Sequence, residues 1–287
     1  MKPWNSIIER FGYDRREARL KSTAVVHGSL RERYFEKRIE HERIYAIGDI
    51  HGEFDLFCEA LRLIKSDNGR RSPANSVILL LGDVVDRGSR SRQMLEMLQR
   101  FHTTSSGLLV LRGNHEEMLL QSARGDEAVQ RLWLRSGGRQ TLESYGIVPD
   151  DFTRCSPLDR AKQLSAALGD ETLRWLEGRP LSYRSGDYFF CHAGVKPGID
   201  LGKQSTKDLL WIRNRFLFSD ADHGAVVVHG HTEVCEPEIL HNRINIDTGA
   251  YRSGRLSVIG LQGPERWLLR ATLPHRSPMR TRSKLKL

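Results

Sequence analysis

Aspartate, asparagine and histidine side chains stand directly after five short apolar segments of this 287-residue chain, each close to a glycine. The five stretches read GDIHG at 48–52, GDVVDRG at 82–88, GNHE at 113–116, HAG at 192–194 and HGHT at 229–232. Carboxylate and imidazole groups bind first-row divalent metals, and glycine lets the backbone approach a bound group closely. A single Gly-Asp pair after a strand is usually a turn, but five such stretches in succession predict a metal site.

Two details of these stretches indicate a pair of metal ions. The Asp-x-His spacing of Asp49 and His51 places both side chains on the same side of an extended segment, so both can reach one ion. The carboxylate of Asp83 has two oxygens and can bridge two ions. Two ions need several donors, and the five segments supply them.

The apolar segments before these motifs are four or five residues long and rich in Val, Ile, Leu or aromatic residues, which is typical of buried strands. Strands are expected at 44–47, 77–81, 108–111, 188–191 and 225–228. The early connections carry apolar residues three or four apart, which predicts helices, as at Phe54, Phe57, Leu61 and Ile64. A further helical stretch over 117–176 is expected to shape the substrate face.

Toward the C-terminus, the apolar pattern changes from alternating strands and helices to strands alone. Residues 244–247 and 256–261 flank a glycine-containing turn and are expected to form a terminal hairpin. Alternating strands and helices followed by strands predict a layered α/β sandwich. In such folds the strand ends form the usual crevice for a ligand, so the metal site is expected there.

The composition excludes several classes of protein. With 39% hydrophobic and 28% charged residues, the chain is neither disordered, nor collagenous, nor a coiled coil. Its net charge of +9 lies at the ends, because 270–287 and 1–43 carry the excess of Lys and Arg and the remainder is close to neutral. We therefore expect a charged N-terminal extension over 1–43, one domain over 44–269, and a basic, disordered tail over 270–287.

No apolar run approaches the ~20 residues that cross a bilayer, and the N-terminus lacks the apolar core of a signal peptide. A cytoplasmic protein without membrane contact is therefore expected. The four cysteines form no CxxC pair, which predicts reduced, buried thiols rather than a zinc knuckle or a disulfide framework; they are Cys58, Cys155, Cys191 and Cys235.

The blocks GDIHG, GDVVDRG and GNHE resemble, in order and spacing, the signature of the phosphoprotein phosphatase family of the metallophosphoesterase superfamily. Later segments resemble its compact bacterial Ser/Thr phosphatase branch: WLRSGGRQTLESYG, HAGVKPG, LLWIRNRFL, VVHGHT and NIDTGAYRSGRLSVIGL. The resemblance covers 44–262. It implies a calcineurin-like αββα fold, a β-sandwich flanked by helices, with a dinuclear metal site at the strand ends.

The resemblance also implies a role for individual residues. One metal would be held by Asp49, His51 and Asp83, and the other by Asp83, Asn114, His192 and His231. The remaining roles fall to His115 as general acid, Asp86 as the carboxylate that orients it, and Arg87 and Arg213 as phosphate clamps. Mn²⁺ is the expected ion, with Fe, Zn or Mg as alternatives.

Three neighbours of these residues are left open. Arg215 lies two residues from Arg213 and could replace it as a phosphate clamp. Tyr251 stands where eukaryotic members carry a tyrosine on the substrate side, and its reach to phosphate is unresolved. His229 is expected to pack behind the site rather than to bind metal.

The implied reaction is hydrolysis of a phosphomonoester by a hydroxide that bridges the two metals, with His115 protonating the leaving group. The expected substrate is phosphoserine or phosphothreonine on a protein, or another phosphorylated molecule. Symmetrical hydrolysis of diadenosine tetraphosphate is the alternative within the superfamily. The enzymes that hydrolyse diadenosine tetraphosphate usually carry aspartate where this chain has Glu116. This difference favours phosphoserine or phosphothreonine as the substrate.

Two other functional classes fit less well. Superfamily nucleases and several phosphodiesterases carry Gly-His-x-His, and here Glu233 stands where the second histidine would be. A protein that binds polyanions through its basic termini is the alternative from another class. The segment 270–287 contains no aromatic residue for base stacking, so nucleic acid is not an expected partner.

Overall fold

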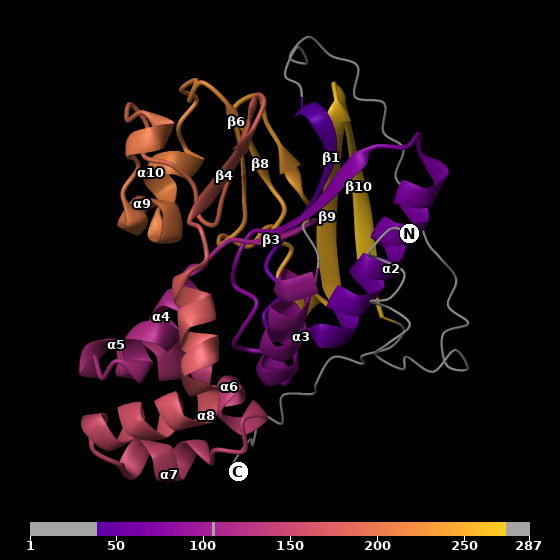
Figure 1. Ribbon diagram of the computed structural model, residues 1–287. Coiled ribbons are helices and arrows are strands. Elements are labelled where there is room, and N and C mark those ends of the chain that lie inside the picture. Colours follow the sequence, from indigo (N-terminus) through magenta and orange to yellow (C-terminus); the bar gives the residue numbers. More distant parts are fainter. Residues whose placement is uncertain (1–38, 105–106, 274–287) are drawn as a thin grey trace, which may run out of the picture.

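The computed structural model describes residues 39–104 and 107–273 of the chain (Figure 1). The predictions for 1–38 and 274–287, most of the N-terminal extension and of the basic tail, lie outside the described residues. Two five-stranded sheets form the centre of the structure. Each combines three neighbouring parallel strands with two strands paired antiparallel.

The first sheet has the order β10-β9-β1-β2-β3. Its strands are β1 (Ile39–Ile47), β2 (Asn75–Leu80), β3 (Leu108–Val110), β9 (Arg255–Gly263) and β10 (Glu265–Thr272). The second sheet has the order β4-β5-β6-β8-β7. Its strands are β4 (Ser182–Ser185), β5 (Tyr188–Cys191), β6 (Val226–His229), β7 (Glu238–Ile239) and β8 (Arg243–Asn245).

The sheets pack face to face because their side chains alternate, as the twofold period of a strand requires. In β1, Ile44 and Ala46 belong to the apolar layer between the sheets, whereas Tyr45 and Ile47 belong to the core on the outer face. The second sheet alternates in the same way between this central layer and a smaller outer cluster. Three apolar layers therefore hold the molecule together.

Helices cover both outer faces (Figure 1). On the first sheet lie α2 (Phe54–Arg70) and α3 (Ser91–Thr104), and on the second lie α9 (Thr206–Trp211) and α10 (Asn214–Leu217). A helical group beside the strand ends consists of α4 (Asn114–Ala123), α5 (Glu127–Trp133), η1 (Leu134–Gly138), α6 (Arg139–Ser144), α7 (Pro149–Arg154) and α8 (Pro157–Glu177). The short elements η2 (Leu201–Lys203) and α11 (Ala250–Ser253) complete the order. The helix-sheet-sheet-helix sandwich and the helical stretch over 117–176 are confirmed.

The predicted terminal hairpin is wrong. The strands expected at 244–247 and 256–261 lie in different sheets, since β8 pairs with β6 and β7 while β9 pairs with β1 and β10. Both segments are almost entirely buried, so each needs a neighbouring strand on both sides, and α11 crosses between the sheets.

The hairpin partner of β9 is β10, a strand that was not predicted from the sequence. In β10 the buried positions are Trp267, Leu269 and Ala271, and the half-buried Leu268 between the first two interrupts the apolar-polar alternation in the sequence. Gly263, at a φ of 52°, starts the tight turn between the two strands. Because β10 reaches Thr272, the first residues of the predicted tail are paired with β9. At the other end, β1 begins at Ile39, inside the predicted extension.

The remaining general predictions concern cysteines and membranes. All four cysteines are free, but only Cys191 is buried and Cys235 is exposed, so the expectation of buried thiols holds for one of them. Among the described residues, no helix combines the length and apolar character that crossing a membrane would require.

Candidate functional site

The ends of β1, β2 and β3 meet the ends of β5 and β6 at one edge of the sandwich, because all five strands are parallel within their sheets. The loops after these strands carry the six predicted metal ligands. None is more than 7% exposed; they are Asp49, His51, Asp83, Asn114, His192 and His231. The structure therefore brings the whole predicted ligand set together in a buried position.

The backbone of these loops is strained at the functional residues. Among the described residues, the non-glycine positions with positive φ are His51, Asp83, Asp86, Arg87 and His231, at 49° to 71°. Such conformations cost on the order of 1–3 kcal/mol each and persist only where the surroundings impose them. All five belong to the predicted site, so the fold holds these side chains in positions that the free chain avoids.

Glu116 is one of the groups that hold the strained loop in its conformation. Its buried carboxylate accepts hydrogen bonds from the N–H groups of Gly113 and Asp83, both at 2.8 Å, and of Val84 at 2.8 Å. Burial, together with the charge of Asp83, raises the pKa of Glu116 to about 7. Glu116 thus ties the second motif to the third, and its side chain binds backbone rather than facing the substrate side.

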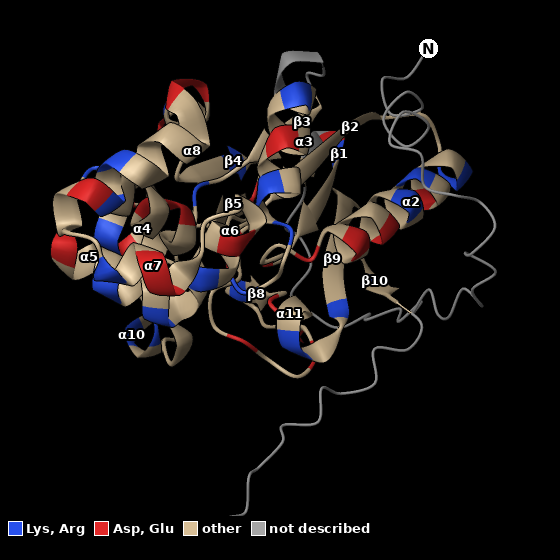
Figure 2. Ribbon diagram, turned by 90° about the horizontal axis from the view of Figure 1, so that it is seen from below, with Lys and Arg blue, Asp and Glu red and all other residues tan. Residues whose placement is uncertain are grey.

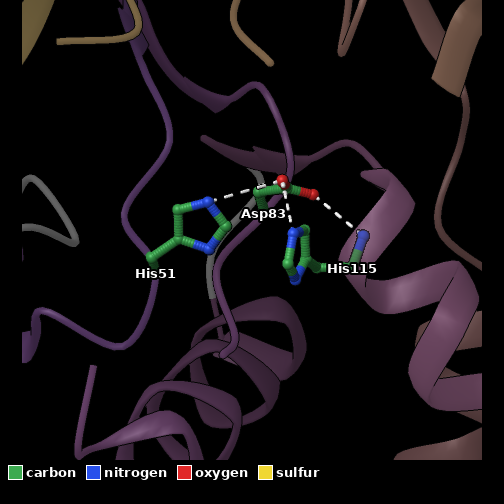
Figure 3. Close-up of side chains that lie close together, drawn as sticks. All are labelled: His51, Asp83 and His115. Carbon is green, nitrogen blue, oxygen red and sulfur yellow. Dashed lines mark hydrogen bonds and ion pairs between the residues drawn. The ribbon is translucent and has the colours of Figure 1, made fainter. Parts of the chain in front are cut away.

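Asp83 lies at the centre of the site. Its Oδ2 is 3.6 Å from Nε2 of His51 and 3.8 Å from Nε2 of His115, and its Oδ1 accepts the backbone N–H of His115 at 3.0 Å (Figure 3). A Cβ on Gly113 would lie 2.1 Å from Oδ1, so only glycine fits there. The predicted bridging carboxylate is therefore in contact with residues from both neighbouring motifs.

The second group of donors surrounds Oδ1 of Asp83. Nε2 of His192 lies 3.3 Å from this oxygen and 2.7 Å from Oδ1 of Asn114. The same Asn114 oxygen is 2.8 Å from Nδ1 of His231. Potential ligand atoms of Asp83, His192 and His231 all lie within 4.8 Å of one another, as do those of His51, Asp83 and His115.

Asp49 joins the loop after β1 to the loop after β6. Its Oδ2 accepts the backbone N–H of His231 at 3.1 Å, and a Cβ on Gly230 would lie 2.0 Å from its Oδ1. Burial and the charges of Asp247 and Asp83 raise the pKa of Asp49. A carboxylate held in such surroundings requires a positive charge close by to stay ionised.

The donor set fits a divalent metal pair. Two of its buried atoms, Oδ1 of Asp49 and Nε2 of His231, have no hydrogen-bond partner in the part of the chain described. Buried polar atoms of this kind cost free energy unless a ligand satisfies them. Carboxylate, amide and imidazole donors together suit first-row divalent ions.

The protonation of the histidines separates their roles. Burial lowers the pKa of His51, His192 and His231, which keeps these imidazoles neutral and able to bind metal. Burial also raises the pKa of Asp83, but the surrounding imidazoles, led by His192, outweigh it and leave the pKa lowered. The ligands are thus in the protonation states that metal binding requires.

His115 behaves differently. Its Nδ1 is 2.7 Å from Oδ2 of Asp86, a carboxylate that also accepts hydrogen bonds from the Trp133 indole at 2.9 Å and from the Thr141 hydroxyl at 2.6 Å. Burial lowers the pKa of His115, but the charge of Asp83 and the bond to Asp86 outweigh it, so the pKa is raised. A buried imidazolium held in one orientation can donate a proton.

A family model of calcineurin-like phosphoesterases matches residues 42–251 of the chain. The chain belongs to the calcineurin-like phosphoesterase family. It is therefore a metal-dependent phosphoesterase of a family that uses two divalent ions, and the buried histidine and aspartate groups described above could hold such ions.

Relatives of this phosphoesterase carry out different reactions. Serine/threonine-protein phosphatase 1 of Salmonella typhimurium is 29% identical over 227 residues, 76% of this chain and 92% of the relative. A symmetrical bis(5'-nucleosyl)-tetraphosphatase of Methylococcus capsulatus is 32% identical over 154 residues, 54% of this chain and 44% of the relative. Among solved structures, a cold-active protein-tyrosine phosphatase of a psychrophilic Shewanella has a TM-score of 0.53 and 19% identity, covers 81% of each chain, and shares the fold.

The two predicted phosphate clamps of the phosphoesterase lie near different residues of the site. Nη2 of Arg87 is 3.4 Å from Nε2 of His115. Arg213 is exposed at the start of α10, and its charge adds to burial in lowering the pKa of His192 and His231. Arg215 shows no contact with the site within the described residues. Both α10 and α11 carry basic residues on the face seen in Figure 2.

The structure also shows the contacts of Tyr251 and His229, the other two neighbours that the sequence left open. The ring of Tyr251 lies 5.5 Å from the ring of His51, and its hydroxyl donates to Glu233 at 2.9 Å. His229 is buried against Phe216, with ring centroids 5.0 Å apart, and belongs to neither group of potential ligands. His229 therefore packs behind the site, as expected, and the Tyr251 hydroxyl binds a carboxylate.

Several supporting residues of the phosphoesterase were not identified from sequence. Trp133 and Thr141 hold Asp86, and Glu116 holds the strained loop. Asp247 is buried beside Asp49, and burial raises its pKa to about 6. Each lies within a motif quoted for the resemblance, so a signal existed, but motif membership alone does not state what a side chain contacts.

Proposed function

We propose that this phosphoesterase hydrolyses phosphoserine and phosphothreonine on proteins. The observation that carries the proposal is His115, which is held 2.7 Å from Asp86 and has a raised pKa. Serine and threonine leave as strongly basic alkoxides, so their departure requires a proton donor of this kind. The coverage of the Salmonella typhimurium serine/threonine phosphatase, 92% of its length, supports the same substrate class.

Two metal ions, for which we propose Mn²⁺, would be held by the six ligands described above. When bound, they supply positive charge for the phosphoryl oxygens and lower the pKa of water. The chain's own residues complete the site. Arg87 and Arg213 are proposed to bind the phosphate oxygens, and their charge meets the negative charge that grows in the transition state.

The proton route on the leaving-group side follows from the hydrogen bonds of His115. Nδ1 is occupied by Asp86, so Nε2, which faces Asp83 and Arg87, is the atom that would donate the proton. Asp86 is itself fixed by Trp133 and Thr141, which prevents the imidazole from turning. The proposed acid therefore has one orientation, with Nε2 directed toward Asp83 and Arg87.

A second candidate is hydrolysis of dinucleoside tetraphosphates. The Methylococcus capsulatus relative, a symmetrical tetraphosphatase, is 32% identical over its matched region. The side chain of Glu116 binds backbone N–H groups, so its presence in place of aspartate does not separate the two substrates. The need for an acid does separate them, because a nucleotide phosphate leaves as a weakly basic anion.

The test is a direct comparison of the two substrates. Hydrolysis rates for a phosphoserine peptide and for diadenosine tetraphosphate are measured side by side with Mn²⁺, and again after chelation. We expect a higher kcat/KM for the peptide and no activity with either substrate after chelation. A strong preference for the dinucleotide, releasing two ADP, would make the second candidate correct.

A further inference from the structure

Glu233, two residues after the predicted ligand His231, connects three other side chains at the edge of the site. Its Oε1 lies 3.5 Å from Nη1 of Arg87 and accepts the Tyr251 hydroxyl at 2.9 Å. Its Oε2 pairs with Arg252. The carboxylate is thus shared between the loop after β2, which carries Arg87, and helix α11, which carries the other two partners.

The guanidinium of Arg87 is held through Nε, Nη1 and one of its faces. Nε donates to the carbonyl oxygen of Ser136 at 3.4 Å, and Nη1 faces Glu233. The ring of Tyr251 lies beneath the guanidinium, with its centroid 4.7 Å from Cζ. Nη2 points instead toward Nε2 of His115, at 3.4 Å. Three contacts therefore fix the group while one nitrogen faces the proposed phosphate site.

Glu233 is itself held in place by the backbone. Gly249, just before α11, has a φ of 61°, and a Cβ at this position would lie 2.7 Å from Oε2 of Glu233. The side chain of Glu233 is only 22% exposed. The carboxylate therefore has a fitted position against α11 and does not extend into solvent.

We propose that Glu233 is a positioning residue that orients Arg87 for phosphate binding. The inference rests on the proposed role of Arg87 in binding phosphate. A long arginine side chain loses rotamer freedom when it binds a ligand, and a partner that fixes it beforehand removes that loss from the binding step. The negative charge of Glu233 would also oppose phosphate, but Arg252 and the Tyr251 hydroxyl share that charge.

The experiment uses p-nitrophenyl phosphate and the metal-loaded full chain, so that it does not depend on the natural substrate. We expect Glu233→Ala to raise KM about tenfold, and the inhibition constant of inorganic phosphate in parallel, with a much smaller change in kcat. Glu233→Gln retains an acceptor for Tyr251 without the charge and should fall between. Metal content and thermal stability are measured in the same samples and should stay unchanged.

The matched control is Glu236→Ala. Glu236 lies on the same loop and pairs with Arg255 and Arg270, away from the site, so its loss should leave KM unchanged. The second control is Arg87→Ala, alone and combined with Glu233→Ala. If Glu233 acts through Arg87, the double variant should have the KM of Arg87→Ala alone.

Several outcomes would overturn the proposal. Equal effects of Glu233→Ala with and without Arg87 would show that the two residues act independently. A lower KM in Glu233→Ala would show that the carboxylate competes with phosphate. A loss of bound metal would assign the effect to the neighbouring His231. An unchanged KM in Arg87→Ala would instead refute the phosphate-binding role of Arg87 itself. If Arg87→Ala raises KM and the Glu233 variants do not, only the positioning role of Glu233 is refuted.

Discussion

The proposed metal-binding side of the site and its proposed proton-donating side, called the metal side and the proton-donating side below, differ in how completely their polar atoms are paired. On the metal side, Oδ1 of Asp49 and Nε2 of His231 are buried without a partner among the described residues. On the other side, Asp86 accepts hydrogen bonds from His115, Trp133 and Thr141. The first side is built to receive an ion, whereas the second is already complete within the protein.

Protonation follows the same division. Burial keeps His51, His192 and His231 neutral, although they lie within a few residues of strand ends just as His115 does. His115 alone has a raised pKa, because Asp83 and Asp86 outweigh its burial. The position of a carboxylate next to one ring nitrogen therefore distinguishes His115, the proposed proton donor, from the three proposed metal ligands.

Asp83 belongs to both sides, so Asp83→Asn should have the largest effect. The variant weakens both proposed metal sites at once and removes a charge next to His115. Two metal ions each supply several kcal/mol of transition-state stabilisation, and a loss of about 6 kcal/mol corresponds to about 10⁴-fold in rate. Activity and metal content are measured together. Full activity that survives chelation would contradict the assignment of these ligands.

Replacing the acid alone should separate the two sides. His115→Gln is expected to retain its metals yet to lower phosphoserine hydrolysis by a factor on the order of 10²–10⁴, because the alkoxide loses its proton donor. A nitrophenolate needs little protonation, so p-nitrophenyl phosphate should be affected much less.

The two substrates and the metal stoichiometry together make the result decisive for His115. Structural damage would lower both rates and the metal content. Equal losses on both substrates with metals intact would place His115 in phosphate binding instead.

Much of the metal side could be predicted from the sequence. Most of the residues that hold the proposed proton donor in place could not. The predicted ligands Asp49 and Asp83 come just after β1 and β2, and parallel strands of one sheet end at the same edge. Their meeting is a consequence of topology, which the apolar segments reveal. The strained backbone at Asp83 was not predictable, because φ at a non-glycine residue is set by partners such as Glu116.

The supports of Asp86 depend on packing between distant segments. Trp133 and Thr141 lie about fifty residues further along the chain and reach Asp86 only because the η1–α6 segment folds against the loop. Gly137 allows this approach, since a Cβ there would lie 2.5 Å from Cγ of Arg87, the residue after Asp86. The hairpin prediction was wrong for a similar reason. A short apolar segment does not reveal which sheet it joins, because this too depends on packing between distant segments.

The pH dependence should report the influence of Asp86 on His115. A general acid works below its pKa, and the raised pKa of His115 extends activity to higher pH. Asp86→Asn removes one cause of that rise, so the alkaline limb of kcat/KM for a phosphoserine peptide should move to lower pH. The same limb for p-nitrophenyl phosphate should stay in place. A shift of both limbs would mean that the titrating group is not the leaving-group acid.

Trp133→Phe should give the smallest effect. It tests whether Trp133, which contacts Asp86 rather than His115, contributes to the proton-donating side. The indole N–H donates to both oxygens of Asp86, at 3.0 and 2.9 Å, while phenylalanine keeps most of the buried ring. Asp86 retains the Thr141 hydroxyl and His115, so the loss is that of one hydrogen bond, about 1 kcal/mol or roughly fivefold in rate. We expect this decrease for phosphoserine hydrolysis, no change for p-nitrophenyl phosphate, and unaltered metal content. A variant that loses metal instead would show that Trp133 supports the ligand loops as well, and the division between the two sides would then be less sharp than their hydrogen bonds indicate.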